Sequence, residues 1–168
     1  MAGQRIVIAD TGPLLALSWT HRVGLLNHLF DRVVVPFEVW GELAHRPDAF
    51  EPPQVAALSY LEFAPPDFLV PAEAEALDPG ERAVLALAVG HLPRATLLID
   101  ERRARKAAKE LGLRVVGTLG VLVEAKRQDL LTAIGPLMEE MISNGIYFGP
   151  QLVERILAAV GDDSRGSR

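Results

Sequence analysis

The run Arg5-Ile-Val-Ile-Ala-Asp10 places four apolar residues directly before an aspartate. Thr96-Leu-Leu-Ile-Asp100 repeats this arrangement in the second half of the chain. Short apolar runs that are rich in β-branched residues predict buried strands. The carboxyl ends of parallel strands form one edge of an open sheet, where functional groups gather, so we expect Asp10 and Asp100 to face the same edge.

Apolar runs alternate with helical patterns along the rest of the chain. Residues 33–35 and 114–116 predict two further strands. Helices are expected over residues 14–19, 23–30, 37–44, 54–60, 78–88, 101–111, 119–127, 130–144 and 150–160, whereas residues 63–71, with three prolines, are expected to be extended or irregular. This order predicts an α/β fold in which helices cover both faces of a parallel sheet.

Length and composition predict one intracellular domain. The 168 residues suit a single core, so we expect one domain over 1–160 and a disordered polar tail over 161–168. Cysteine is absent, which excludes disulfides and thiolate metal sites and favours a reducing compartment. No signal-peptide pattern and no run long enough to span a membrane is found, so we expect a cytoplasmic protein without membrane association.

The net charge of -5 argues against binding nucleic acid by bulk charge, because such chains are usually basic. Any contact with RNA must then come from a local basic patch or from a bound metal. An acidic enzyme that acts on no polymer is the alternative that net charge alone favours.

Asp10 and Asp100 are candidate metal ligands. Two carboxylates held close together repel each other unless a proton or a cation lies between them, and Mg²⁺ and Mn²⁺ prefer oxygen ligands. Each residue also has a simpler interpretation, because Asp10 before Thr-Gly-Pro is a plausible turn residue and Asp100 is a plausible helix N-cap. Their shared position at strand ends favours a site.

Glu42 and Glu81 have stronger structural alternatives. Glu42 lies near the apolar stripe of its expected helix, where a solvated surface glutamate is the usual finding. Asp78 and Glu81 have the spacing of a capping box, in which Glu81 reaches back to the N–H of Asp78. Spacing alone favours the cap over metal binding.

Taken together, these motifs resemble the PIN domain family, and within it a prokaryotic branch related to VapC-type toxins. The resemblance extends over nearly the whole chain and rests on Ile8-Ala-Asp10-Thr11-Gly12, Val35-Pro36 with Val39, Glu42 and Leu43, Pro79-Gly80-Glu81, Leu98-Ile99-Asp100-Glu101, Thr118-Leu-Gly-Val121 and Gly145-Ile-Tyr-Phe148. It implies a PIN-like three-layer α/β/α sandwich with a central, mainly parallel sheet. It also implies a nuclease that depends on Mg²⁺ or Mn²⁺ and acts mostly on RNA.

The resemblance further implies roles for individual residues. The catalytic and metal-binding acids would be Asp10, Glu42, Glu81 and Asp100, with Thr11 and Glu101 close to the metal. The expected function is a metal-dependent endoribonuclease, the toxin of a toxin–antitoxin pair, with a small antitoxin protein as partner and a homodimeric assembly. The alternative is a catalytically weak or silent PIN-fold module that binds a protein partner, since Leu98 and Ile99 replace the hydroxyl residue that the family often has before the late aspartate.

A basic helix follows Asp100. Arg102, Arg105, Lys106 and Lys109 are expected to form one face and to contact the phosphate backbone of RNA. A solvated helix face with ordinary salt links to Glu101 and Glu110 is the equally weighted alternative. The apolar segment around Tyr147 is a further candidate contact surface.

Overall fold

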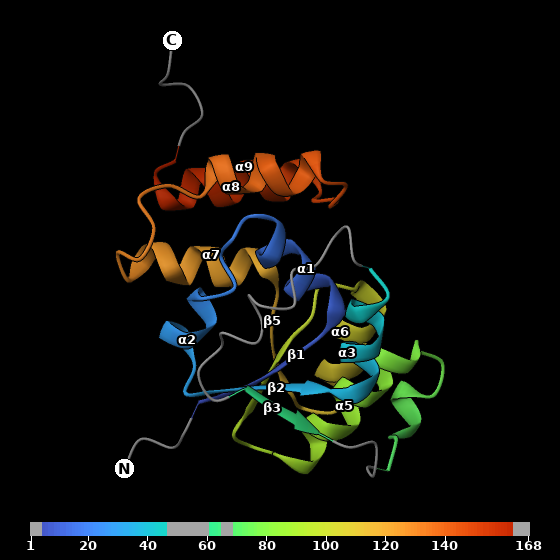
Figure 1. Cartoon of the computed structure of the whole chain (residues 1–168). Helices are drawn as coiled ribbons and strands as arrows, with labels where there is room; N and C mark the ends of the chain where they lie inside the picture. Colours follow the sequence, from blue (N-terminus) through green and yellow to red (C-terminus); the bar gives the residue numbers. More distant parts are fainter. Residues whose placement is uncertain (1–4, 47–60, 65–68, 163–168) are drawn as a thin grey trace.

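The computed structural model describes residues 5–46, 61–64 and 69–162 and shows a parallel sheet flanked by helices (Figure 1). Its five strands are β1 (Ile6–Ala9), β2 (Arg32–Pro36), β3 (Leu61–Ala64), β4 (Ala95–Leu98) and β5 (Arg114–Val116). The strand order is β3-β2-β1-β4-β5, and every pairing is parallel. The predicted α/β fold is confirmed.

Strand β1 lies at the centre of the sheet. Ile6 pairs with Arg32 of β2 on one side and with Ala95 of β4 on the other. All four residues of β1 are buried, as expected for a strand that helices cover on both faces. The chain leaves β1 towards β2 and later crosses to β4, so the loops after β1 and β4 diverge and open a crevice at the carboxyl edge.

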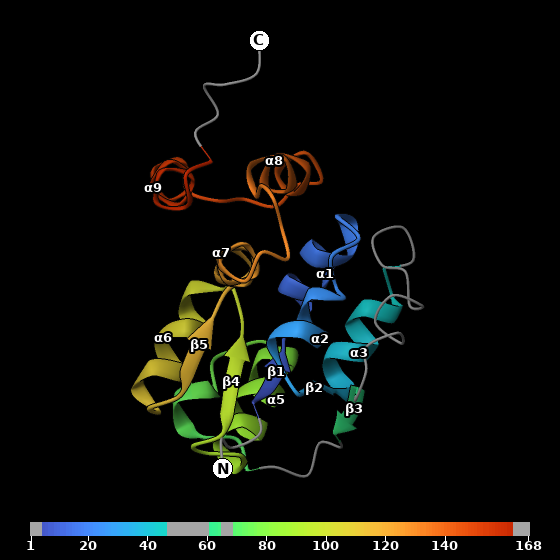
Figure 2. The same ribbon diagram turned by 90° about the vertical axis from the view of Figure 1, so that its left-hand side faces the viewer.

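Helices pack on both sides of this sheet. In the described ranges the helices are α1 (Thr11–Trp19), α2 (Leu25–Leu29), α3 (Phe37–Ala44), α5 (Pro79–Gly90), α6 (Arg102–Glu110), α7 (Thr118–Arg127), α8 (Gly135–Ser143) and α9 (Pro150–Val160), with a 3-10 turn, η1 (Ala72–Ala74). Helix α5 packs on β1, β2 and β4 and lies between α3 and α6, whereas α2 and α1 pack against α7. Figure 2 shows these two helical groups on either side of the strands.

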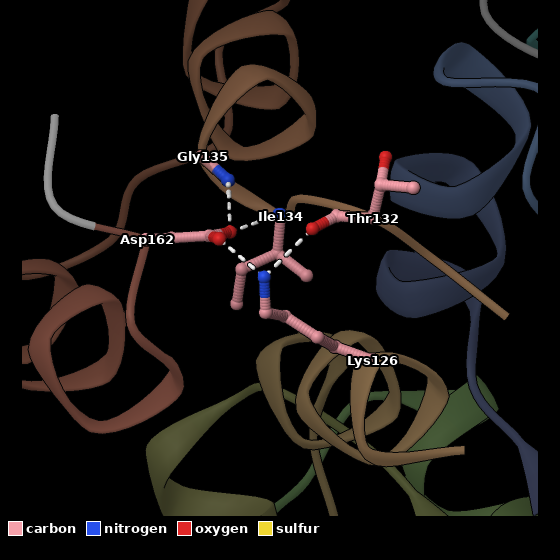
Figure 3. A network of polar contacts seen from close by, with 5 residues as sticks. All are labelled: Lys126, Thr132, Ile134, Gly135 and Asp162. Atoms are coloured by element: carbon pink, nitrogen blue, oxygen red, sulfur yellow. Dashed lines mark hydrogen bonds and ion pairs between the residues drawn. The ribbon is translucent and has the colours of Figure 1, made fainter. Parts of the chain in front are cut away.

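Helices α8 and α9 lie side by side beyond α7 and α1, at the top of Figures 1 and 2. A cluster of polar contacts, the C-terminal clasp, ties them to α7 (Figure 3). In it the carboxylate of Asp162, just after α9, accepts hydrogen bonds from the N–H groups of Ile134 and Gly135 and pairs with Lys126 Nζ. Lys126 Nζ also donates to Thr132 O at 2.7 Å. The clasp therefore joins the end of α7, the start of α8 and the end of α9.

The clasp lies partly in the range expected to be a disordered tail. Gly161 adopts the left-handed conformation that ends α9, with φ 71°, and Asp162 is fixed by the contacts just described. These two residues therefore belong to the folded domain. Residues 163–168 lie outside the described part of the chain, as does the helix expected over 54–60.

Helix α8 and strand β3 depart from the expected elements. The helix expected over 130–144 begins only at Gly135, because a longer helix would place the ring of Pro136 against the carbonyl of Thr132. Starting at Gly135 puts the proline in the first turn, where it is favourable. Residues 61–64 form β3 on the outer side of β2; residues 63–64 were expected to be extended or irregular, but no strand of the sheet was predicted there.

None of the helices in the described ranges combines the length and the apolar character that a membrane crossing requires.

Candidate metal centre

Asp10 ends β1 and begins the helix that follows. Its backbone N–H continues the sheet by donating to Leu98 O at 3.0 Å, which fixes its position beside β4. Asp10 is the N-cap residue of α1, yet its side chain makes no capping hydrogen bond. The carboxylate accepts a local hydrogen bond from the backbone of Thr11, which agrees with the turn interpretation and still leaves lone pairs for a ligand.

The Asp10 carboxyl group is electrostatically strained. The residue is 8% exposed, and its pKa is raised from 3.8 to about 7, mainly by burial, against a backbone hydrogen bond from Thr11 that lowers it. The negative charges of Glu81, Glu42 and Asp100 contribute to this rise. Within the described ranges no lysine or arginine pairs with Asp10, so the protein itself supplies no cation to relieve this repulsion.

Glu42 connects the helix after β2 to the starts of two other helices. Its Oε2 accepts a hydrogen bond from Thr11 Oγ1 at 2.5 Å. Its Oε1 lies against Gly80 of α5, where an added Cβ would come within 2.6 Å. Glu42 is thus positioned from both sides, and Thr11, expected near the metal, is the residue that orients it.

Glu81 forms the predicted capping box at the start of α5. Its Oε2 accepts from the N–H of Asp78 at 3.1 Å. Burial raises the pKa of Glu81, the bond from Asp78 lowers it, and the charge of Glu101 raises it again. Its Oε1 has no hydrogen-bond partner among the described residues, so the cap leaves one carboxylate oxygen able to bind a ligand.

Three of the four predicted acids line one open cleft of about 770 Å³. Its walls come from the starts of α1 and α5 and from α3, and they are formed by Asp10, Thr11, Gly12, Leu15, Gly41, Glu42, His45, Arg46, Asp78, Pro79 and Glu81. Sequence reasoning assigned Asp78 to the capping box alone and did not place His45 and Arg46 at the site. The last two follow Glu42 by about one helical turn, and this spacing is the signal that would have placed them on the same face.

Asp100 follows β4 in the chain, and its carboxylate contacts the N-terminus of α7. It lies outside the walls of the cleft. Its Oδ1 accepts from the N–H of Thr118 at 2.8 Å, and its Oδ2 accepts from Thr118 Oγ1 at 2.6 Å. The N-cap interpretation of Asp100 is wrong, because Glu101 caps α6 by accepting from the N–H of Ala104 at 2.8 Å. Asp100 is nevertheless close enough to Asp10 for its charge to raise the pKa there.

A second hollow of about 580 Å³ lies next to Asp100. Its walls contain the five cationic residues of α6, namely Arg102, Arg103, Arg105, Lys106 and Lys109; we call it the basic groove. Arg105 is half-buried, and its Nη1 donates to Ile99 O at 2.9 Å. The expected basic face therefore exists, with Arg105 committed partly to the backbone.

The starts of three helices face these acids. Asp10 precedes α1, Glu81 lies in the first turn of α5, and Asp100 binds the first residue of α7. Helix N-termini carry partial positive charge and free N–H groups, which stabilise anions by about 0.3–1 kcal/mol each. These helices offset part of the repulsion and make the acidic cleft compatible with a stable fold.

The donor set fits a hard divalent cation. The acidic side chains of the cleft offer carboxylate oxygens, the ligands that Mg²⁺ and Mn²⁺ prefer. Asp10 is buried among like charges, which a cation would relieve. In the described ranges no three acidic or histidine side chains converge into a finished ligand set; Glu42 and Glu81 each have an oxygen engaged by Thr11 and Asp78, respectively.

Comparison with known proteins identifies the family. A family model described as PIN domain matches residues 6–162, and no curated protein matches the chain. PIN domains typically bind divalent metals, and membership suggests a nuclease-like function. The match covers the sheet, the acidic cleft and the C-terminal clasp, and the chain belongs to the PIN domain family.

Proposed function

We propose that this protein is an endoribonuclease that depends on Mg²⁺ or Mn²⁺. The observation that carries the proposal is Asp10, which is buried at the end of the central strand and has a pKa raised to about 7 among like charges. A fold tolerates such a group when function requires it, and strongly perturbed carboxyl groups in clefts are typical of active sites. Membership of the PIN domain family supports the same conclusion.

In this proposal the acidic residues have different roles at the metal site. Asp10, Glu42 and Glu81 hold the cation, and Asp100 beside them offers a further carboxylate to it, directly or through a bound water. A bound cation supplies an acidified water and stabilises charge on the phosphate oxygens. Thr11 keeps Glu42 in place through its hydroxyl, and Glu81 remains anchored to the start of α5 by its capping bond.

The basic groove is the proposed binding surface for the RNA backbone. Arg102, Lys106 and Lys109 are exposed there, and phosphate contacts of this kind position a strand without reading its sequence. Because Asp100 lines the groove and also acts on Asp10, a strand in the groove would pass close to the acidic cleft.

The test is cleavage of end-labelled single-stranded RNA and of DNA with the same sequence. The wild type should cut RNA internally with Mn²⁺ or Mg²⁺ and should stop when EDTA is added. Asp10→Asn should lower the rate by more than ~100-fold, since losing about 3 kcal/mol of transition-state stabilisation is sufficient.

Asp129→Asn is the matched control. Asp129 is exposed, lies outside the cleft and adopts φ 57°, which asparagine also tolerates. The Asp129→Asn variant should cleave RNA at the same rate as the wild type. Cleavage that persists in Asp10→Asn, or in EDTA, would show that the activity comes from a contaminating nuclease or from another site.

We also propose the toxin role, with a small antitoxin as partner and a homodimer as the assembly. Expression in a bacterial host should arrest growth for the wild type and not for Asp10→Asn. Equal arrest by both proteins would favour the alternative, a silent module that acts by binding a protein. Tyr147, which is 83% exposed, is a residue at which to test such a contact.

A further inference from the structure

Asp100 is held by a single buried residue from another part of the chain. Thr118 donates both its backbone N–H and its hydroxyl, one to each oxygen of the Asp100 carboxylate, at 2.8 and 2.6 Å. Asp100 is exposed, whereas Thr118 is 0% exposed. The carboxylate therefore faces accessible space, while its orientation is set from inside the fold.

The neighbours of Thr118 leave this arrangement little freedom. A Cβ at Gly117 would lie 2.6 Å from Asp100 Oδ1 and 2.9 Å from Arg105 Nη1, so a side chain there would displace the carboxylate and the guanidinium from their present positions. Arg105 also fixes the peptide just before Asp100 by donating to Ile99 O at 2.9 Å. Asp100 is thus constrained both at its backbone and at its carboxylate.

Thr118 differs in this respect from another buried threonine of the fold. Thr20, also buried, directs its hydroxyl to the carbonyl oxygens of Ala16 and Leu17 inside its own helical turn. Water could satisfy the exposed Asp100 carboxylate without help from Thr118. Two donors from one buried residue also fix the direction of the carboxylate, which groups that support metal and substrate sites require.

We propose that Thr118 is a positioning residue of the nuclease site. Its hydroxyl and N–H occupy one lone pair on each oxygen of Asp100, which leaves the other lone pairs for the cation or for a water on it. The inference rests on the proposed function and assigns to it a residue from α7, the last element of the fold to reach the site.

The test compares Thr118→Val, which keeps the N–H and the side-chain shape, with Thr118→Ser, which keeps the hydroxyl. Thr20→Val is the matched control for loss of a buried threonine hydroxyl. The measurements are the melting temperature, Mn²⁺ affinity from electron paramagnetic resonance, and kcat and KM for RNA cleavage. We expect Thr118→Val to weaken Mn²⁺ binding and to lower kcat by about 10–100-fold each, with KM nearly unchanged.

Rescue and coupling separate positioning from general stability. Thr118→Ser should restore kcat to within about threefold of the wild type, and Thr20→Val should keep wild-type Mn²⁺ affinity even if its melting temperature falls. In an Asp100→Asn background, Thr118→Val should cause no further loss, because residues that act through one interaction are not additive.

Each outcome decides the proposal. An active wild type whose Mn²⁺ affinity and kcat survive Thr118→Val would overturn the positioning role and leave the nuclease function standing. Full additivity with Asp100→Asn would overturn it too. A wild type that neither binds Mn²⁺ nor cleaves RNA would overturn the nuclease function and this inference together.

Discussion

Asp10 links the chemistry of the cleft to the stability of the fold. Its pKa is raised to about 7, first by burial and then by the charges around it. In the unfolded chain the same group ionises near 3.8. Between these values the folded protein holds a proton that the unfolded chain has released, so the free energy of unfolding falls as pH rises from about 4 to 7 and then levels off.

Asp10→Asn should remove this pH dependence. Raising the pKa from 3.8 to about 7 corresponds to about 4 kcal/mol of stability lost above pH 7. In EDTA the variant should therefore be more stable than the wild type at pH 8, and the gap should narrow towards pH 4. Urea denaturation at several pH values measures the difference in the free energy of unfolding between the variant and the wild type. A difference that widens as pH falls would contradict the burial argument.

Gly80 should matter for metal binding more than for folding. Alanine there would place its Cβ 2.6 Å from Glu42 Oε1, at the end of a flexible side chain that can move away. Gly80→Ala should thus change stability by less than ~1 kcal/mol, helped by the helix preference of alanine, yet weaken Mn²⁺ binding about tenfold. Gly24→Ala, with no neighbour within 4 Å, is the control that should bind Mn²⁺ normally.

The roles of single residues could be predicted from the sequence where they depend on neighbours a few positions away. The capping box of Asp78 and Glu81 follows from spacing alone and is present. Spacing did not show which of Asp100 and Glu101 caps α6. The structure shows that Glu101 is the N-cap. The partner of Asp100 is Thr118, eighteen residues away in sequence, and no local pattern predicts that contact.

Among the elements, α6 divides its cations between two tasks. Arg105 turns inward to Ile99 O, whereas Lys109 is exposed in the basic groove. Lys109→Gln should therefore raise KM for RNA and reduce the salt dependence of binding by about one charge, since each phosphate contact releases counterions. Fluorescence anisotropy across a salt series measures this slope, and Arg127→Gln, an exposed cation on α7, should leave it unchanged.

The C-terminal clasp makes a separate prediction for α7, α8 and α9. Burial would raise the pKa of Asp162, but hydrogen bonds from Lys126, Ile134 and Gly135 outweigh it and lower the pKa. A lowered pKa means that the stabilisation is complete above the unfolded value of 3.8 and is lost as pH falls through the folded value. Asp162→Asn should cost about 2 kcal/mol at pH 7.

Chemical denaturation at pH 7 and at a series of acidic pH values tests the clasp. The difference between the wild type and Asp162→Asn should shrink as the pH falls through the folded pKa of Asp162, because the wild-type carboxylate then becomes protonated. Asp129→Asn should have the same free energy of unfolding as the wild type at each pH. An equal loss at every pH would mean that the charge of Asp162 is not what stabilises the three helices.

The predictions of element boundaries were wrong where tertiary contacts determine those boundaries. Apolar periodicity carried the helix prediction back to residue 130, but Pro136 and the clasp start α8 at Gly135. Strand β3 exists because β2 offers it a free edge for pairing. Neither the clasp nor that edge is visible in a short window of sequence.

For the molecule as a whole, a bound cation should act as a folding ligand. A ligand that binds only the native state stabilises it by about 2.7 kcal/mol at 100 times its Kd, which is roughly 5–10 °C for a chain of this size. Mn²⁺ should raise the melting temperature of the wild type accordingly. The rise should be larger at pH 8 than at pH 6, because Asp10 must lose its proton to bind metal.

Differential scanning fluorimetry with Mn²⁺ and then with EDTA measures this effect. Asp10→Asn should show little shift at either pH. A shift of the same size in the variant would place the cation elsewhere on the surface.

The class of the fold was readable from the alternation of strands and helices, and the order of its strands was not. The sequence predicts that Asp10 and Asp100 share an edge, and the pairing of β1 with β4 confirms that the strands before them are neighbours. It does not predict that Asp100 would face the basic groove while Glu42 and Glu81 line the cleft with Asp10. That division depends on side-chain directions set by α5 and α7.

The central position of β1 also bears on how the protein is made. Synthesis delivers Asp10 and Glu42 early, but β4 and Thr118 leave the ribosome only after many further residues, and long-range pairings form late. A nascent chain therefore carries acidic side chains without the strand and helix that gather them. If the finished protein cuts RNA, this delay shields the messenger and the ribosome that are still producing it.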